Sequence, residues 1–365
     1  MKIGIDIRPV FDSPAGIGRY AENLVRALLA EDSENEFVLF AGKSSREDVF
    51  PGAKLIKIAH ECYFWHFLAA LYAKRERIDL YISFASIIVP LISKMKSIIM
   101  VPDLTPLSMP ESHHIKSVVA YRFFLGRAIR KAEKIITLSQ NSRRDVLARF
   151  PIPEEKVRII YPGISRMENN GRPNGLFHVN GRDVRRPYLL YVGTVEPRKD
   201  LGALIRAFAG LKREGIFQGR LFLAGKLGWK YEALFELPEY FEFKDYIHFL
   251  GYVSEEELCE LYGAAEIFVY PSLYEGFGLP ILEAMQFGLP VVTCASSSLE
   301  EAGGDGVLYF PPGDAEELRA QLKKLLQDPA LREALIQRGK KHIAKFQYAY
   351  SAKELQKLIM ECNSA

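Results

Sequence analysis

Short apolar, β-branched segments alternate with amphipathic segments along most of this chain of 365 residues. In the first half, the pattern predicts strands at residues 2–6, 36–40, 55–58, 80–83, 98–101, 134–138 and 157–160. Helical periodicity lies between several of them, for example at residues 19–30, 117–132 and 142–150. Strands that alternate with helices are typical of βαβ units, in which the strands run parallel. The first half is therefore predicted to be an α/β, doubly wound parallel sheet.

The alternation stops and then restarts, which predicts a second domain. Residues 164–187 are polar, rich in Gly and Asn, and without a period, as in a linker or a loop. Beyond them, strands are predicted at residues 188–192, 221–224, 247–250, 267–270, 291–293 and 307–310, and helices at 200–213, 255–264, 281–287 and 314–327. We predict two Rossmann-like domains that face a central cleft, at residues 1–165 and 187–345, with a linker at 166–186. A last helix, at residues 350–363, is expected to pack back onto the first domain.

Composition narrows the class of protein. The formal net charge of +3 does not by itself indicate a nucleic-acid partner. The four cysteines show no CxxC and no framework spacing, which favours free thiols in a reducing cytosol. The first residues do not resemble a signal peptide, and no segment reaches about 18 apolar residues without a charge. We expect a cytoplasmic protein that does not span a membrane.

Glycines follow the first predicted strand, where an open parallel sheet binds its ligands. The segment "PAGIGRY", residues 14–20, places Gly16 and Gly18 before a helix. Glycine lets a ligand approach the backbone closely, and a helix N-terminus attracts phosphate. A plain turn before a helix is an equal alternative, because the segment is not a G-x-G-x-x-G fingerprint.

Two cations follow the first strand of the second half. They are Arg198 and Lys199 in "GTVEPRKD", residues 193–200. Together they could neutralise a diphosphate. The alternative is a solvated charge pair at the start of a helix. Cations are mildly unfavourable at that position, however, and this indicates an anion nearby.

Two glutamates enclose a glycine loop in "SLYEGFGLPILEAM", residues 272–285. Glu275 precedes the loop, and Glu283 is placed in the first turn of the helix predicted at residues 281–287. Backbone N–H groups of the loop could donate to a ligand, and the carboxylates could accept from hydroxyls. This combination suits a ligand with both phosphate and sugar hydroxyls. The alternatives are a tight turn and a carboxylate that stabilises the helix dipole.

Metal and hydrolase chemistry find little support in the sequence. Asp103 follows a predicted strand of the first half, and it could accept a hydroxyl or simply cap a turn. There is no D-x-D pair, the seven histidines lack metal-ligand spacing, and neither a G-x-S-x-G elbow nor a Walker A loop occurs. We therefore expect no catalytic metal.

These motifs resemble the retaining, nucleotide-sugar-dependent glycosyltransferases of family 4, which have the two-domain GT-B architecture. The likeness covers nearly the whole chain. It rests on "GIGRY", "LSQNSRRDV", "YVGTVEPRKDLGALIRAF", "LAGKLGW", the stretch that contains the E-x7-E pair Glu275 and Glu283, and "SSSLEEAGGDGVLYF". The segments "GTVEPRKD" and "AGKLGW" resemble those of bacterial mannosyl- and rhamnosyltransferases that build surface polysaccharides such as lipopolysaccharide.

The resemblance implies a hexosyltransferase that needs no cofactor and no metal, with GDP-mannose as the favoured donor and a glycan or a lipid-linked acceptor. The first domain would bind the acceptor and the second the nucleotide sugar. Glu275, Arg198, Lys199 and Asp103 would be catalytic, and the cations would stabilise the leaving diphosphate in place of a metal. The implied donor-binding residues are Gly16, Gly18, Gly193, Arg198, Lys199, Tyr252, Val253, Glu275, Gly276, Phe277, Gly278, Leu279 and Glu283.

One position departs from the family pattern. Many relatives carry a histidine just before the aspartate of the first-domain loop, and here Pro102 precedes Asp103. The histidine's contact with the donor sugar would then pass in part to Asp103, or the donor sugar would differ. His113 and His114 are candidate substitutes.

The sequence is also compatible with other functions and with a membrane partner. A sugar-nucleotide epimerase, a phosphorylase and a non-catalytic sugar-nucleotide sensor would use similar ligands, although the chain is short for a phosphorylase. Residues 113–149 contain nine Lys and Arg against two acids, and "CYFWHFLAALYAKRER", residues 62–77, is aromatic with a basic end. Such segments can lie on the inner face of an anionic membrane, or they can be amphipathic core helices with solvated faces.

Overall fold

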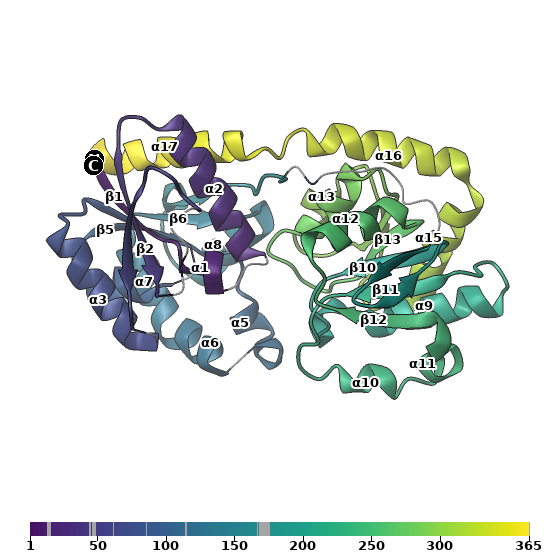
Figure 1. Cartoon of the computed structure of the whole chain (residues 1–365). Coiled ribbons are helices and arrows are strands. Elements are labelled where there is room, and N and C mark those ends of the chain that lie inside the picture. Colours follow the sequence, from purple (N-terminus) through teal and green to yellow (C-terminus); the bar gives the residue numbers. More distant parts are fainter. Residues whose placement is uncertain are drawn as a thin grey trace. The chain divides into compact units, whose positions relative to one another are not determined.

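The computed structural model describes residues 1–12, 16–43, 45, 49–60, 62–84, 86–113, 115–165, 167 and 176–364. They form two compact units, one of Met1–Ser165 with Phe346–Ala365 and one of Arg166–Lys345 (Figure 1). His114, the first residues of "PAGIGRY" and much of the predicted linker lie outside the described residues.

The first unit is built on a parallel sheet of seven strands, in the order β3-β2-β1-β4-β5-β6-β7. The strands are β1 (Lys2–Asp6), β2 (Glu36–Gly42), β3 (Lys54–Ile58), β4 (Leu80–Ser83), β5 (Lys96–Met100), β6 (Lys134–Thr137) and β7 (Val157–Ile159). Strand order reverses between β1 and β4. At such a switch point the helices of successive crossovers lie on opposite faces, and a parallel sheet leaves a place for a ligand outside its carboxyl ends.

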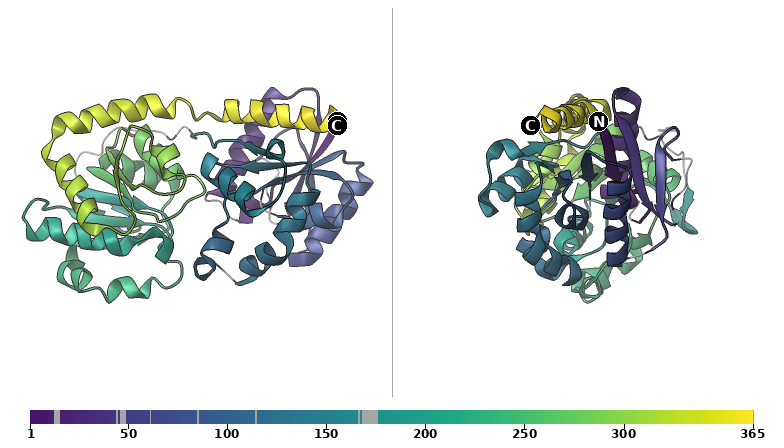
Figure 2. Two further views of the ribbon diagram at one scale, coloured as in Figure 1. Left: turned by 180° about the vertical axis from the view of Figure 1, so that it is seen from behind. Right: turned by 90° about the vertical axis from the view of Figure 1, so that its left-hand side faces the viewer.

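Helices surround this sheet. They are α1 (Arg8–Asp12), α2 (Ile17–Glu31), α3 (Cys62–Arg75), α4 (Ile88–Ile92), α5 (Thr105–Ser108), α6 (Ile115–Ala120), α7 (Gly126–Lys131), α8 (Gln140–Arg149) and α17 (Tyr348–Ser364). Helix α17 packs against α2, so both ends of the described chain lie in this unit (Figure 2). The stretch predicted as one helix at 117–132 contains a π-helical segment, Tyr121–Leu125, between α6 and α7.

The second unit repeats the same topology in a parallel sheet of six strands, in the order β12-β11-β10-β13-β14-β15. The strands are β10 (Tyr188–Val192), β11 (Arg220–Ala224), β12 (Ile247–Gly251), β13 (Ile267–Tyr270), β14 (Val291–Cys294) and β15 (Leu308–Phe310). Here the switch point lies between β10 and β13. Two Rossmann-like sheets, as predicted from the alternation, are thus confirmed.

The helices of the second unit fill the connections between its strands. They are α9 (Leu201–Arg213), α10 (Glu232–Phe235), α11 (Pro238–Phe243), α12 (Glu255–Ala264), α13 (Leu279–Gln286), α14 (Leu299–Gly303), α15 (Ala315–Gln327) and α16 (Pro329–Ile343). Serine and aspartate caps start several of them; Ser254 and Glu257 form a capping box at α12. Helix α16, which was not predicted, packs against α13.

A small hairpin lies inside the segment predicted to be a linker. Strands β8 (Phe177–Val179) and β9 (Arg182–Val184) pair antiparallel around Asn180 and Gly181. Both turn residues have positive φ, 49° and 73°, as a two-residue type I′ turn requires. The Asn180 amide donates to the carbonyls of Leu250 and Tyr252, at 2.9 and 2.7 Å. The hairpin is therefore part of the second unit, and it occupies part of the segment predicted as a linker or loop at residues 166–186.

Candidate active site

The predicted cations and the first glutamate meet at the switch point of the second sheet. Arg198 and Lys199 end a 3-10 turn, Pro197–Lys199, which follows β10. Glu275 follows the neighbouring strand β13. The backbone N–H of Leu273 donates to the Arg198 carbonyl at 2.9 Å and ties the two loops together. Residues that are 76 apart in sequence are thus joined at the edge of the sheet where a ligand is expected.

The Glu275 carboxylate is shared by both cations. Its Oε2 lies 3.0 Å from Arg198 Nη1, and its Oε1 accepts from Lys199 Nζ. The other end of the Arg198 guanidinium pairs with Glu196 at 2.7 Å. Two acids and two bases balance in formal charge, and the side chains of all four are at most 13% exposed. Buried charges are tolerated when they are paired and hydrogen-bonded in this way.

Hydroxyl groups complete the cluster. Tyr270 Oη donates to Glu275 Oε1 at 3.1 Å, and the Glu275 N–H donates to Ser297 Oγ at 2.9 Å. Ser298 Oγ lies 2.7 Å from the Glu275 carbonyl and 3.0 Å from that of Phe277. These contacts hold the glycine loop by its backbone. The acid is therefore presented by a fixed loop.

Opposing effects set the pKa of each charged group. Burial would raise the pKa of Glu275, but the charges of Lys199 and Arg198 outweigh it and lower this pKa to about 2. Burial lowers the pKa of Lys199 more than Glu275 raises it. Burial also opposes the charge on Arg198, yet Glu275 and Glu196 raise its pKa. An ionised Glu275 can accept hydrogen bonds at neutral pH, but it has no proton to give.

The lowered pKa predicts how Glu275 contributes to stability across the acid range. A carboxyl group with a depressed native pKa stabilises the fold above its ordinary value of 4.5, and this contribution is lost as the pH falls toward 2. The free energy of unfolding of the wild type minus that of Glu275→Gln should therefore decrease by about 1 kcal/mol between pH 6 and pH 3.5. Urea titrations at several pH values measure it. A difference in free energy that does not change with pH would show that Lys199 and Arg198 do not lower the pKa of Glu275.

The second glutamate lies deeper in its helix than predicted. Helix α13 begins at Leu279, two residues earlier than expected, after Gly278 with a φ of 113°. A side chain at Gly278 would be strained by this φ, and its Cβ would lie 2.9 Å from Leu299. Glu283 is consequently in the second turn rather than the first. It accepts from Tyr262 Oη at 2.9 Å.

The other predicted donor-site residues of the second unit lie at strand ends. Gly193 follows β10, and its φ of 154° goes with a close approach to Tyr191 Oη that leaves no room for a Cβ. Tyr252 follows β12 with 59% of its surface exposed, and Lys226 Nζ lies 5.3 Å from its ring centroid. Val253, next to it, is buried.

The remaining predicted residues belong to the first unit. Gly16 caps α2 with a φ of 54°, whereas Gly18 is already inside that helix and buried. Asp103 Oδ1 accepts from the backbone N–H and the hydroxyl of Thr105, so it is held in the turn that precedes α5. His113 Nε2 lies 2.8 Å from the same hydroxyl. The arrangement links His113 to Asp103 through Thr105.

Four residues of the cluster around Glu275 were missed from the sequence: Glu196, Tyr270, Ser297 and Ser298. Glu196 precedes the proline of "EPRK", and an acid two residues before a buried arginine could have been recognised as its partner. Tyr270 ends a strand that looks purely apolar, and no local signal marks its hydroxyl. The serines belong to "ASSSLEE", in which nothing distinguishes the two positions that contact the Glu275 loop.

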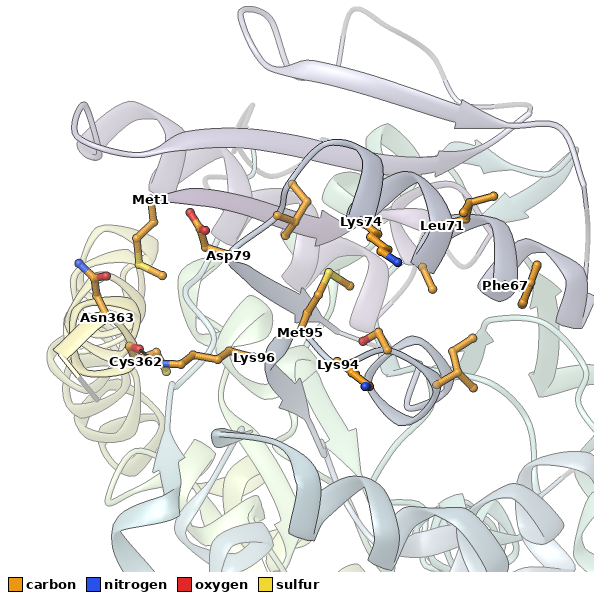
Figure 3. Close-up of a pocket in the computed structure, with 14 residues that line it drawn as sticks. Met1, Phe67, Leu71, Lys74, Asp79, Lys94, Met95, Lys96, Cys362 and Asn363 are labelled. Carbon is orange, nitrogen blue, oxygen red and sulfur yellow. Dashed lines mark hydrogen bonds between the residues drawn. The ribbon is translucent and has the colours of Figure 1, made fainter.

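A hollow of about 920 Å³ lies elsewhere, at the amino ends of the strands of the first sheet (Figure 3). Phe67, Leu71 and Met95 form part of its apolar wall, and Lys74 and Lys94 line it as well. None of these residues belongs to the predicted site. Among the side chains that the structure describes, no three of His, Cys, Asp or Glu are grouped so that they could hold a metal ion.

Two family models match this chain. The model described as "Glycosyl transferases group 1" matches residues 176–342, and "Glycosyltransferase Family 4" matches residues 14–166. The two matches follow one another and together span most of the chain. Each corresponds to one of the two sheets.

Individual proteins agree with these matches. "O-antigen chain mannosyltransferase B" of Escherichia coli is 36% identical over 65% of this chain and 63% of its own length. The chain therefore matches less than two thirds of that relative. Among solved structures, the fold resembles a sucrose-phosphate synthase of Thermosynechococcus elongatus, with a TM-score of 0.76, 19% identity and coverage of 100% and 99%. It also resembles Anabaena HepE, solved with UDP and glucose, with a TM-score of 0.73, 16% identity and coverage of 99% and 100%.

Proposed function

Since the chain belongs to glycosyltransferase family 4 and has the GT-B architecture, we propose that it transfers a hexose from a nucleoside-diphosphate sugar to a hydroxyl of a glycan or lipid-linked acceptor. The observation that carries this proposal is the Glu275 carboxylate held by two buried cations at the switch point of the second sheet. The mannosyltransferase relative supports a role in the synthesis of surface polysaccharides such as lipopolysaccharide.

A bound donor would exchange partners within this cluster. Its diphosphate would compete with Glu275 for Arg198 and Lys199, because phosphate oxygens are strong acceptors for both cations. Glu275, released in part, would then accept from hydroxyls of the sugar. The diphosphate and the sugar hydroxyls would thus bind to groups that pair with one another in the structure. Glu283, on the next helix, would accept from the ribose hydroxyls.

We also propose that the reaction retains the anomeric configuration and needs no metal. The bond from C1 of the sugar to the diphosphate would break and a bond from C1 to the acceptor oxygen would form on the same face. A diphosphate oxygen would take the proton of the acceptor hydroxyl, while Arg198 and Lys199 stabilise the departing negative charge. Transfer that continues in EDTA would support the assignment of that role to the cations.

GDP-mannose is the donor that we favour, because the Escherichia coli relative that is 36% identical is a mannosyltransferase. A thermal-shift panel of sugar nucleotides tests this choice, since a ligand that binds only the native state raises the Tm by mass action. GDP-mannose should give the largest increase in Tm. An increase with UDP-glucose alone would point to a different base and sugar, and no increase with any sugar nucleotide would contradict the proposed donor site.

Peripheral contact with an anionic membrane is proposed for the first unit. Phe64, Phe67 and Leu71 lie at helical spacing on α3, and each is more than half exposed. Lys74 and Arg75 follow in the last turn of α3 and are exposed as well. Apolar side chains next to cations are the combination that binds anionic lipid surfaces. In the part of the chain that the structure describes, no helix has the length and apolarity needed to cross a bilayer.

Vesicle sedimentation tests this membrane contact. Substituting both Phe67 and Leu71 by serine should reduce binding to vesicles with anionic lipid by ~10-fold or more, because the insertion of each large side chain contributes about 1 kcal/mol or more. Phe241→Ser is the matched control, since Phe241 is 67% exposed but lies in the second unit. Wild-type binding should weaken at high salt. Equal binding by neutral and anionic vesicles would contradict the role of the cations.

A further inference from the structure

A second polar cluster lies at the switch point of the first sheet. Asp6 ends β1 and Ser83 ends β4, and the two residues are paired across these parallel strands. Both are fully or almost fully buried. This is the position in the first unit that the Arg198–Glu275 cluster occupies in the second, because both sheets reverse strand order between their first and fourth strands. A ligand is expected at this edge of either sheet.

Asp6 fixes the guanidinium of Arg8. The two carboxylate oxygens accept from Arg8 Nε at 3.0 Å and from Nη2 at 2.6 Å. The Arg8 backbone N–H donates to the same carboxylate at 3.2 Å. The buried ring of Trp65 covers one face of the guanidinium, with its centroid 3.4 Å from Cζ. The side chain is therefore held in orientation before any ligand arrives.

A neutral histidine lies beside the Arg8 guanidinium. His66 Nδ1 lies 3.2 Å from Ser86 Oγ and 3.5 Å from Arg8 Nη2. Burial and then the charge of Arg8 lower the pKa of His66 to about 4, and Asp6 opposes them only in part. His66 is consequently uncharged at neutral pH. The charges of Asp6 and Arg8 balance, so the cluster has no net formal charge.

The remaining donor of this cluster is Nη1 of Arg8. Within the described residues, Arg8 has polar contacts through its backbone, Nε and Nη2, and its side chain keeps 17% of its surface exposed. Burying an ion pair seldom stabilises a fold relative to apolar side chains of the same size. A fixed arginine with a donor left at a ligand-binding edge is better explained by recognition. Because this cluster has a single cation, which Asp6 already pairs, hydroxyl oxygens suit it better than a phosphate, for which the cluster of the second unit offers two cations.

We infer that Arg8 binds hydroxyl oxygens of the acceptor sugar at the carboxyl edge of the first sheet. This inference rests on the proposed function and adds to it the residue that holds the acceptor. Asp6 and Trp65 are positioning residues in this account, since they act by orienting the guanidinium. The cluster is built from residues of the first unit alone, whereas Arg198 and Glu275 belong to the second.

Acceptor kinetics with Arg8→Lys test the inference. Lysine keeps the charge that Asp6 requires but loses the forked, planar donors. With octyl α-mannoside as the acceptor and GDP-mannose as the donor, the variant should raise the acceptor KM ~10- to 100-fold, as expected for hydrogen bonds from a charged group. The increase in Tm produced by GDP should not change, which also shows that the variant folds. Arg26→Lys, at an exposed arginine of α2 that pairs with Glu22, should leave both quantities unchanged.

Four results would overturn the inference. An acceptor KM that is unchanged in Arg8→Lys would show that Arg8 does not hold the acceptor. Loss of GDP binding in this variant would assign Arg8 to the donor, and competition by inorganic phosphate that depends on Arg8 would assign it to an anion. Failure of the wild type to transfer any sugar to the mannoside would overturn the proposed function together with this inference.

Discussion

Substitution of Arg198 by alanine should lower kcat for sugar transfer by ~10²- to 10³-fold. Preorganised donors aimed at developing charge have effects of this size when one is removed. Arg198 is buried and paired with Glu196 and Glu275. We propose that its N–H groups donate to the leaving diphosphate during transfer. Lys199 alone would then face that charge. Steady-state kinetics with GDP-mannose and a mannoside acceptor measure the effect.

Arg213→Ala is the control for this prediction. Arg213 is in the same unit and also pairs with a carboxylate, that of Glu242, but both side chains are more than 40% exposed. Exposed ion pairs contribute about 0–1 kcal/mol, so this variant should keep nearly full turnover. Near-normal turnover by Arg198→Ala would remove the assignment of Arg198 to the diphosphate.

Glu275→Gln should both abolish most transfer and destabilise the second unit. The substitution leaves Lys199 buried without its carboxylate, and removal of one partner from a buried pair costs about 3–5 kcal/mol. Lys199→Met should be destabilising for the complementary reason, because Glu275 then retains only Arg198. In the double variant the two losses of stability should not add, because both charged partners are gone and neither charge is left unpaired. Urea denaturation of the four proteins gives the coupling energy.

Activity separates the structural from the catalytic role of this pair. The double variant should recover part of the stability that Glu275→Gln loses. It should nevertheless remain inactive, because it lacks both the carboxylate that would accept from the sugar hydroxyls and one of the two cations that would bind the diphosphate. Additive losses of stability would contradict the direct Lys199–Glu275 pair. Recovery of transfer by the double variant would show that the pair is structural only.

The architecture follows from the sequence because parallel strands leave a strong local signal. Buried strands such as Leu80–Ser83 and Tyr188–Val192 are short apolar segments between helices, and both were predicted with their observed bounds. The hairpin around Asn180 and Gly181 was missed although Asn-Gly is a strong turn signal, since its strands have only three residues each. Helix α16 was missed as well, despite the cap Asp328 and a proline at its start.

The site follows from the sequence only as far as motifs identify it. "EPRK" and the E-x7-E pair located Arg198, Lys199, Glu275 and Glu283. The pairing of Arg198 and Lys199 with Glu275 could not be predicted, because the contact depends on how two loops fold together. The cluster of Asp6, Arg8, Trp65 and His66 carried no motif. Its members come together only when β1, α1 and α3 are assembled.

The central claim is tested most directly by product analysis with GDP-mannose and octyl α-mannoside in the presence of EDTA. We predict one GDP released for each mannose added to the acceptor, and an α-linkage in the product, seen by NMR at the anomeric proton. A β-linked product would contradict retention. Conversion of GDP-mannose to an epimer, or binding of GDP-mannose with no glycoside formed from any sugar nucleotide, would contradict the assignment as a glycosyltransferase.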